Sequence, residues 1–159
     1  MALKDTLKMI REEKDQAHVR AHNRKIQWLN RLNELIRTID VWILPLKSEG
    51  LVERDERDIT IDEELLGAYS APSLILDFQG TRVEFVPVGT YIMGCAGRVD
   101  VVTTNSRLNP AMVLLPSITA TQWNFAKDAR APAVVFDQSC FENFVEEAIE
   151  RAGRVSISA

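Results

Sequence analysis

The segment from Leu74 to Thr103 constrains the fold more than any other part of the chain. It reads LILDFQGTRVEFVPVGTYIMGCAGRVDVVT and places two Gly-Thr pairs between runs of β-prone residues. Glycine at the first central position is what a two-residue type II′ hairpin turn requires. The segment therefore predicts three antiparallel strands, with turns at Gly80-Thr81 and Gly89-Thr90.

Alternating apolar residues determine which side chains share a face of this predicted sheet. With Gly80-Thr81 as the loop, Asp77 faces Glu84 and Leu76 faces Phe85. One face is then apolar throughout and carries Leu74, Leu76, Phe78, Val83 and Phe85. Because side chains alternate with period two, a slip of one residue on one strand would scatter this set over both faces. We expect a C-terminal helix to cover the apolar face and the N-terminal helix to cover the other.

A long helix is predicted for residues 3–39, a segment of 37 residues with neither proline nor glycine. Its apolar residues recur every three or four positions, which is the spacing of a coiled-coil seam. They are Leu3, Leu7, Ile10, Ala17, Ala21, Trp28, Leu32, Leu35 and Ile39. Such a helix is about 55 Å long, more than a small domain can cover. We therefore expect the Trp28–Ile39 end to dock on the sheet and the first half to pair with another chain, as a homo-oligomer or with a helical partner.

Charge is distributed unevenly along the chain. Residues 1–40 hold nine basic and six acidic side chains, a net charge of +3, whereas the remainder holds ten basic and seventeen acidic ones, a net charge of −7. A basic arm can attract phosphates or an acidic partner, and it can equally attract the acidic body of its own or of a second chain. The interleaving of acids and bases along the arm favours attraction between arm and body.

Three segments follow from these patterns. Residues 1–45 form a helical arm, residues 46–58 an exposed connector rich in charge, and residues 59–159 an α+β domain. Pro45 is expected to end the first helix, because proline disfavours helical backbone at the residue before it. The predicted fold class is therefore α+β: an antiparallel β-meander sheet, a C-terminal helix packed on one face, and a long N-terminal helical arm resembling a coiled coil.

Two capping boxes predict where helices begin within residues 59–159. Thr60 with Glu63 predicts a short helical turn ended by Gly67. Ser139 with Glu142 predicts the start of the C-terminal helix, which we expect to end at Gly153.

The chain lacks the common signatures of catalysis, phosphate binding and metal binding. It contains no GxSxG elbow, no GxxxxGK[ST] loop, no GxGxxG and no cluster of cysteines and histidines. His18 and His22 lie four residues apart, but this spacing alone is a weak signal and predicts a solvated helix face. We expect no metal and no cofactor, and we expect Cys95 and Cys140 to be free thiols in a cytoplasmic protein without a membrane segment.

Two groups of polar residues are candidate binding residues. The predicted register aligns Asp77, Glu84 and Cys95 in one row, and opposed carboxylates can raise one pKa towards that of a general acid. A solvated patch neutralised by Arg82 is the favoured interpretation of this row.

Arg98 and Asp100 form the second group. They point the same way on an extended strand, and glycines at 94 and 97 predict a bulge beside them. This spacing favours a structural ion pair, and it also suits recognition of a carboxylate or phosphate.

The sequence favours a non-enzymatic interaction or regulatory protein over an enzyme. In this hypothesis the chain oligomerises through its N-terminal helix and binds a protein partner, for example as immunity or antitoxin proteins do. Two alternatives stay open: an enzyme of unfamiliar type that uses the carboxylate pair, and a nucleic-acid binder that uses the basic arm with Trp28.

Overall fold

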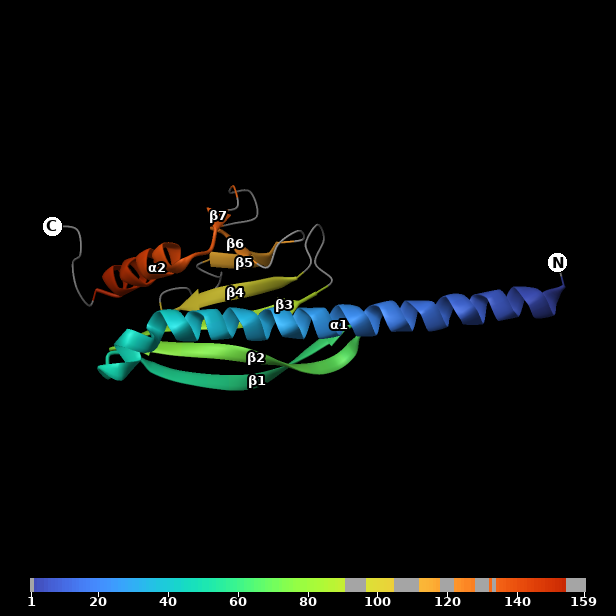
Figure 1. Cartoon of the computed structure of the whole chain (residues 1–159), viewed down its shortest axis with the longest axis horizontal. Helices are drawn as coiled ribbons and strands as arrows, with labels where there is room; N and C mark the ends of the chain where they lie inside the picture. The colour runs from blue at the N-terminus through green and yellow to red at the C-terminus, as the bar shows by residue number, and fades with distance from the viewer. Residues whose placement is uncertain are drawn as a thin grey trace.

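A meandering sheet and two helices make up the fold. The computed structural model describes residues 2–90, 97–104, 112–117, 122–127, 132 and 134–153. Its elements are α1 (Leu3–Ser48), β1 (Glu53–Glu63), β2 (Gly67–Phe78), β3 (Thr81–Gly89), β4 (Arg98–Thr103), β5 (Met112–Pro116), β6 (Trp123–Ala126), β7 (Val134–Val135) and α2 (Gln138–Arg151) (Figure 1). The seven strands form one antiparallel sheet whose spatial order follows the sequence. The predicted α+β meander is confirmed.

Helix α1 is longer than predicted, because it continues through Pro45. It has 46 residues, which corresponds to about 69 Å. Pro45 lies in its last turn, where it removes only the hydrogen bond to the carbonyl of Val41, an exposed residue that water can reach. The helix ends beyond it in a Schellman motif: Leu51 N–H donates to the Leu46 carbonyl at 2.9 Å, and Gly50 adopts a φ of 71°. None of the helices in the described part of the chain is long and apolar enough to cross a membrane.

The predicted connector over residues 46–58 is wrong. Its first residues belong to α1 and its last to β1, which pairs with β2 over its whole length. Charged side chains are typical of edge strands, where they discourage pairing with other chains, and they conceal the strand pattern in the sequence. The helical turn predicted from Thr60 and Glu63 is also wrong, since residues 64–66 form the turn of the β1–β2 hairpin.

The register between β2 and β3 differs from the prediction, although the predicted faces are confirmed. The loop is Gln79-Gly80, with φ values of 54° and 102°, as in a type I′ turn. Moving the loop by one residue shifts each opposed pair by two, so every side chain keeps its face. Asp77 thus faces Arg82 rather than Glu84. The predicted apolar set, Leu74, Leu76, Phe78, Val83 and Phe85, is buried.

The predicted turn at Gly89-Thr90 is wrong as well. The partner of β3 is β4, in which Val102 faces Glu84 and Arg98 faces Gly89. The register shifts between Pro87 and Gly89, which places an irregularity on β3. Thr90 N–H donates to the Glu63 carboxylate at 2.9 Å, so Thr90 contacts the β1–β2 hairpin. Residues 91–96, predicted as the third strand, lie outside the described residues.

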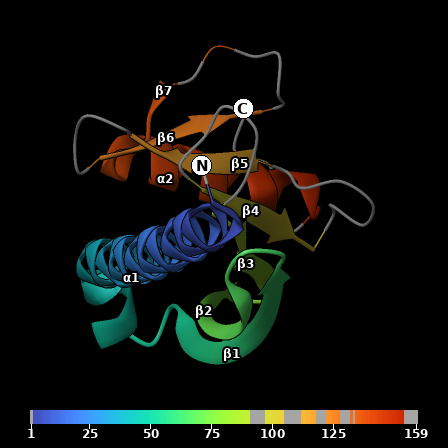
Figure 2. The same ribbon diagram turned by 90° about the vertical axis from the view of Figure 1, so that its right-hand side faces the viewer.

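Both helices pack on the same face of the sheet, contrary to the prediction that they cover opposite faces. Trp42 of α1 contacts Phe136 and Phe141, with ring centroids 5.5 and 5.6 Å apart. Phe141 of α2 in turn contacts Phe78 and Phe85 of the predicted apolar face. Figure 2 shows that the sheet curls around α1. A twisted sheet of this many strands is concave, and its concave face accommodates both helices in one continuous core.

The N-cap of helix α2 is Asp137, and not Ser139 as the sequence indicated. The side chain of Asp137 accepts a hydrogen bond from Cys140 N–H at 2.9 Å and caps the helix. The predicted end is confirmed, because Gly153 follows the last turn with a φ of 71°. Phe141, Val145 and Ala148 form its buried stripe, as the spacing predicted.

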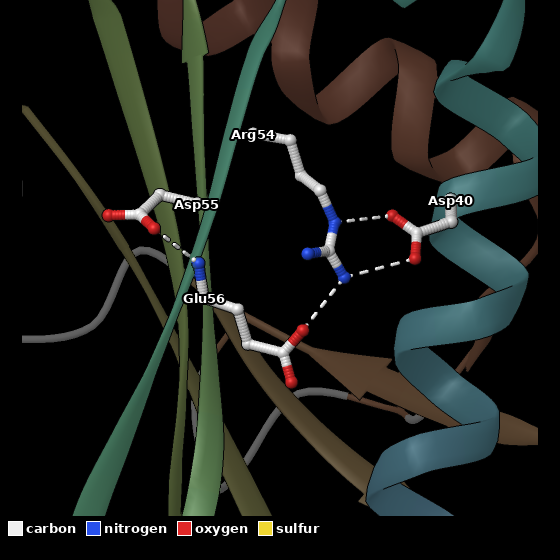
Figure 3. Close-up of polar contacts among 4 residues, drawn as sticks. All are labelled: Asp40, Arg54, Asp55 and Glu56. Atoms are coloured by element: carbon white, nitrogen blue, oxygen red, sulfur yellow. Dashed lines mark hydrogen bonds and ion pairs between the residues drawn. The ribbon is translucent and has the colours of Figure 1, made fainter.

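An ion pair joins α1 to the edge strand β1. Arg54 donates from Nε and Nη2 to the two carboxylate oxygens of Asp40, at 2.8 and 3.1 Å (Figure 3). Nη2 also donates to Glu56 at 2.9 Å. The hydrogen bonding that Arg54 donates to Asp40 is the main reason that the pKa of Arg54 is raised. The two-pronged geometry aligns the strand with the helix, which a single point charge could not do.

We expect Arg54→Lys to lower the free energy of unfolding by about 1 kcal/mol, because lysine cannot form the two parallel bonds. Urea denaturation with circular dichroism detection measures the change. Arg57→Lys on the exposed side of the same strand is the matched control and should stay within about 0.5 kcal/mol of the wild type. Equal losses in the two variants would contradict a specific role for the Arg54–Asp40 pair.

Candidate interaction surface

The predicted row of carboxylates does not form. Asp77 faces Arg82 across the hairpin, and its Oδ1 accepts the Gly80 N–H at 2.7 Å. Glu84 lies opposite Ile75 and forms an ion pair with Arg82 at 2.5 Å. The two carboxylates are therefore not opposed, so the general-acid alternative loses its geometric basis. Arg82 neutralises Glu84, in agreement with the interpretation that the sequence favoured. Cys95 lies outside the described residues.

Arg98 and Asp100 form the ion pair that their spacing favoured. Arg98 Nε donates to Asp100 Oδ1 at 2.6 Å, and both side chains are partly exposed. A register shift occurs on β3 between Pro87 and Gly89, whereas Gly94, where the bulge was predicted to begin, lies outside the described residues. The Arg98 guanidinium is thus held by a carboxylate of its own strand, which is a structural arrangement.

The histidines on α1 do not belong to a metal site in the part of the chain that the structure describes. His18 and His22 are exposed on the helix. Among the described residues, no group of three or more potential ligands lies close enough to hold a metal ion.

A hollow of about 360 Å³ lies between α2 and strands β5–β7. Phe125, Phe144 and Val134 line it together with Cys140 and Asp137. Burial, and secondarily the Asp137 carboxylate, raise the pKa of Cys140 to about 11. Cys140 is therefore protonated at neutral pH and is a poor nucleophile.

The first third of α1 carries several exposed apolar residues. Figure 1 shows that α1 runs along the sheet and then continues well beyond it towards the N-terminus. From Ala21 onwards it buries a stripe that includes Trp28, Leu32 and Ile39. Residues 2–16 are exposed throughout, with Leu3 at 73%, Leu7 at 56% and Ile10 at 44% of their full exposure.

These exposed residues continue the buried stripe. Steps of three and four residues keep side chains on one side of a helix, and such steps connect Leu3, Leu7, Ile10, Lys14 and Ala17 to Ala21. No described residue covers the stripe before Ala17. A helical segment of this length without packing is marginal in water, so the uncovered apolar stripe is a candidate binding surface. We call residues 3–17 the arm.

A series of hydrogen bonds joins α1 to the β1–β2 hairpin at the base of the arm. Arg24 of α1 donates from Nε to Thr90 Oγ1 at 2.8 Å and from Nη2 to the Thr90 carbonyl. Thr90 N–H donates to Glu63, which also accepts the Tyr69 hydroxyl at 2.5 Å. Burial, followed by this bond to Glu63, raises the pKa of Tyr69. These hydrogen bonds hold the β1–β2 turn beside α1 where the helix leaves the sheet (Figures 1 and 2). Sequence reasoning missed them, since the residues involved are far apart and carry no shared pattern.

The indole of Trp28 also fixes the position of α1 near the base of the arm, because it packs on Gly97. Gly97 has a φ of 144°, and a Cβ atom there would lie 2.3 Å from Trp28 Cζ3. Only glycine fits both the backbone conformation and the close approach. Trp28 is 2% exposed, so it positions the helix and is not available to stack on a nucleic-acid base.

Basic side chains flank the apolar residues of the arm. Lys4, Lys8 and Arg11 line a shallow groove together with Leu3 and Leu7. Within the described residues, none of these three cations takes part in an ion pair. The groove therefore offers apolar contact with unneutralised positive charge beside it.

The fold and this surface define a class: a curved α+β domain with a projecting N-terminal helix that presents an uncovered apolar stripe. Comparison with known proteins finds no matching family, no matching curated protein and no matching solved structure. The function must therefore be argued from the surface itself.

We expect Gly97→Ala to lower the free energy of unfolding by about 2–4 kcal/mol, because the added methyl group meets a buried indole and the backbone is strained. Gly50→Ala is the matched control: its φ is also positive, at 71°, but a Cβ there meets nothing within 4 Å. That control should cost about 1 kcal/mol. Thermal or urea denaturation measures both, and equal costs would show that contact with Trp28 does not matter.

We expect native Cys140 to react with iodoacetamide at a rate that reaches half its maximum at about pH 11, because only the thiolate is alkylated. Peptide-resolved mass spectrometry over a pH series measures the rate. In urea the midpoint should fall to about 8.5, the value of a solvated cysteine. A native midpoint below pH 9 would contradict the effect of burial.

Proposed function

We propose that this protein is a non-enzymatic interaction protein that associates with another polypeptide chain through the arm. The observation that carries the proposal is the continuity of one apolar stripe across the point where α1 leaves the sheet. From Ala21 onwards the stripe packs on the chain's own sheet, and residues 3–17 present the same surface with nothing on it. A surface of this kind is what helix-pairing interactions use.

Two other functions are less well supported by the geometry. An enzyme that uses Asp77 and Glu84 would need them together, whereas they lie in separate contacts with Gly80 and Arg82. A nucleic-acid binder that stacks bases on Trp28 would need this side chain exposed, whereas it is buried.

The wider role that fits is the binding of a protein partner by a small, net-acidic chain, as in an immunity or antitoxin protein. The net charge of −4 supports binding of a basic partner by the body. In that arrangement the arm would assemble the chain and the body would bind.

The arm is tested by replacing Leu7 and Ile10 with glutamine, a good helix former. The wild-type chain of 18.0 kDa should show a molar mass that rises with concentration in sedimentation velocity, and the double variant should lose this rise. Val19→Gln/Val41→Gln is the matched control, since both valines are exposed on other sides of α1. If the two double variants behave alike, the stripe is not the site of association.

A further inference from the structure

We propose that a hollow between α1 and the ends of β3 and β5 binds a small polyanion, a metabolite with two or more phosphate or carboxylate groups. We call it the helix–sheet hollow. It has a volume of about 440 Å³, which lies within the range of small-molecule sites. Its polar lining consists of Arg24, Gln27, Asn30, Arg31, Thr90 and Ser117. The hollow lies beyond the arm, and the inference does not depend on the proposed function.

Three segments that are far apart in the chain meet at the helix–sheet hollow. Arg24, Gln27 and Arg31 follow one another at steps of three and four residues, so they lie on one side of α1. β3 and β5 run in the same direction, because each pairs antiparallel with β4 between them. Their C-terminal ends, followed by Thr90 and Ser117, therefore lie at the same edge of the sheet. The fold thus places two hydroxyl side chains opposite a row of basic and amide side chains.

Contacts with neutral groups orient both guanidinium groups of the hollow. Arg24 donates to the side chain and to the carbonyl of Thr90. Arg31 donates from Nη2 to the Gln122 carbonyl at 2.8 Å, and its Cζ lies 5.6 Å from the ring centroid of Trp123. Hydroxyl, carbonyl and indole groups carry no net charge, so these contacts position the two guanidinium groups and preserve their positive charge.

The described lining of the hollow contains cations and no carboxylate. Glu63, which accepts the Thr90 N–H, does not line it. A concave surface lined by one sign of charge concentrates the electrostatic potential. Guanidinium groups bind phosphate and carboxylate through parallel N–H bonds, and the amides of Gln27 and Asn30 add neutral donors. This set of donors favours an anion as the ligand.

The spacing of the two arginines favours a ligand with more than one anionic group. Arg24 and Arg31 are seven residues apart, which separates their Cα atoms by about 10 Å along the helix axis. A chain of phosphate or carboxylate groups bridges this separation more readily than a single phosphate does. Gln27 and Asn30 lie between the arginines on the helix and are exposed, so their amides are placed to contact the middle of such a ligand.

Isothermal titration calorimetry of the full chain tests the site with two probes, tripolyphosphate and citrate. We expect at least one of them to bind with a Kd below about 1 mM. Inorganic phosphate should bind about tenfold more weakly than that probe, because it forms fewer charge-assisted hydrogen bonds. Comparison of the two probes distinguishes a phosphate ligand from a carboxylate ligand.

Gln27→Glu places a carboxylate in the hollow and should weaken binding of the tighter probe about tenfold. Gln16→Glu is the matched control, since both glutamines are exposed on α1 and lie about 16 Å apart along the helix. This distance exceeds the screening length at physiological salt, so the control should keep the Kd to within about twofold of the wild type. Arg31→Gln should also weaken binding about tenfold. Circular dichroism checks that each variant keeps its fold.

Amide NMR shifts locate the bound probe independently of these variants. In ¹H–¹⁵N spectra the largest shifts should occur at the backbone amides of Thr90 and Ser117 and at the side-chain amides of Gln27 and Asn30. Shifts confined to the arm, or equal weakening by Gln27→Glu and its control, would show general attraction to basic side chains and overturn the inference. Failure of both probes to bind at about 10 mM would overturn it as well. Association through the arm is measured separately, by sedimentation, and its outcome leaves this site unaffected.

Discussion

The structure depends on the packing of one apolar stripe of α1 into the concave face of the sheet. Ile39 and Ile43 are completely buried there, as are Leu74 and Leu76 of the strand beneath. Each such side chain contributes about 1.5–3 kcal/mol relative to exposure, so this interface supplies much of the stability. Because the stripe is longer than the sheet that covers it, the arm with its uncovered surface follows directly from the same sequence pattern.

Polar contacts determine where the helix sits along that face. Apolar packing has little directional preference, so a helix with a regular stripe could slide by one turn at modest cost. The Arg54–Asp40 pair lies near one end of the contact and the Arg24–Thr90–Glu63 chain near the other. Each bond contributes only about 1 kcal/mol, but a shift of one turn would break both sets together.

The edge strands illustrate how stability and solubility are reconciled in this sheet. β1 presents exposed charged residues along its length, and β7 has only two residues. Both features discourage pairing with strands of other chains.

The sequence by itself determined the fold class, the buried faces of β2 and β3, the apolar stripes of the two helices and the arm as the candidate surface, because these depend only on local periodicity. It misplaced the Gln79-Gly80 loop, since turns one residue apart preserve the same faces. Only the tertiary structure decided that both helices share one face, that residues 53–58 form a strand, and that Glu63 and Thr90 meet Arg24. These outcomes depend on sheet curvature and on contacts between residues far apart in the chain, which no local pattern encodes.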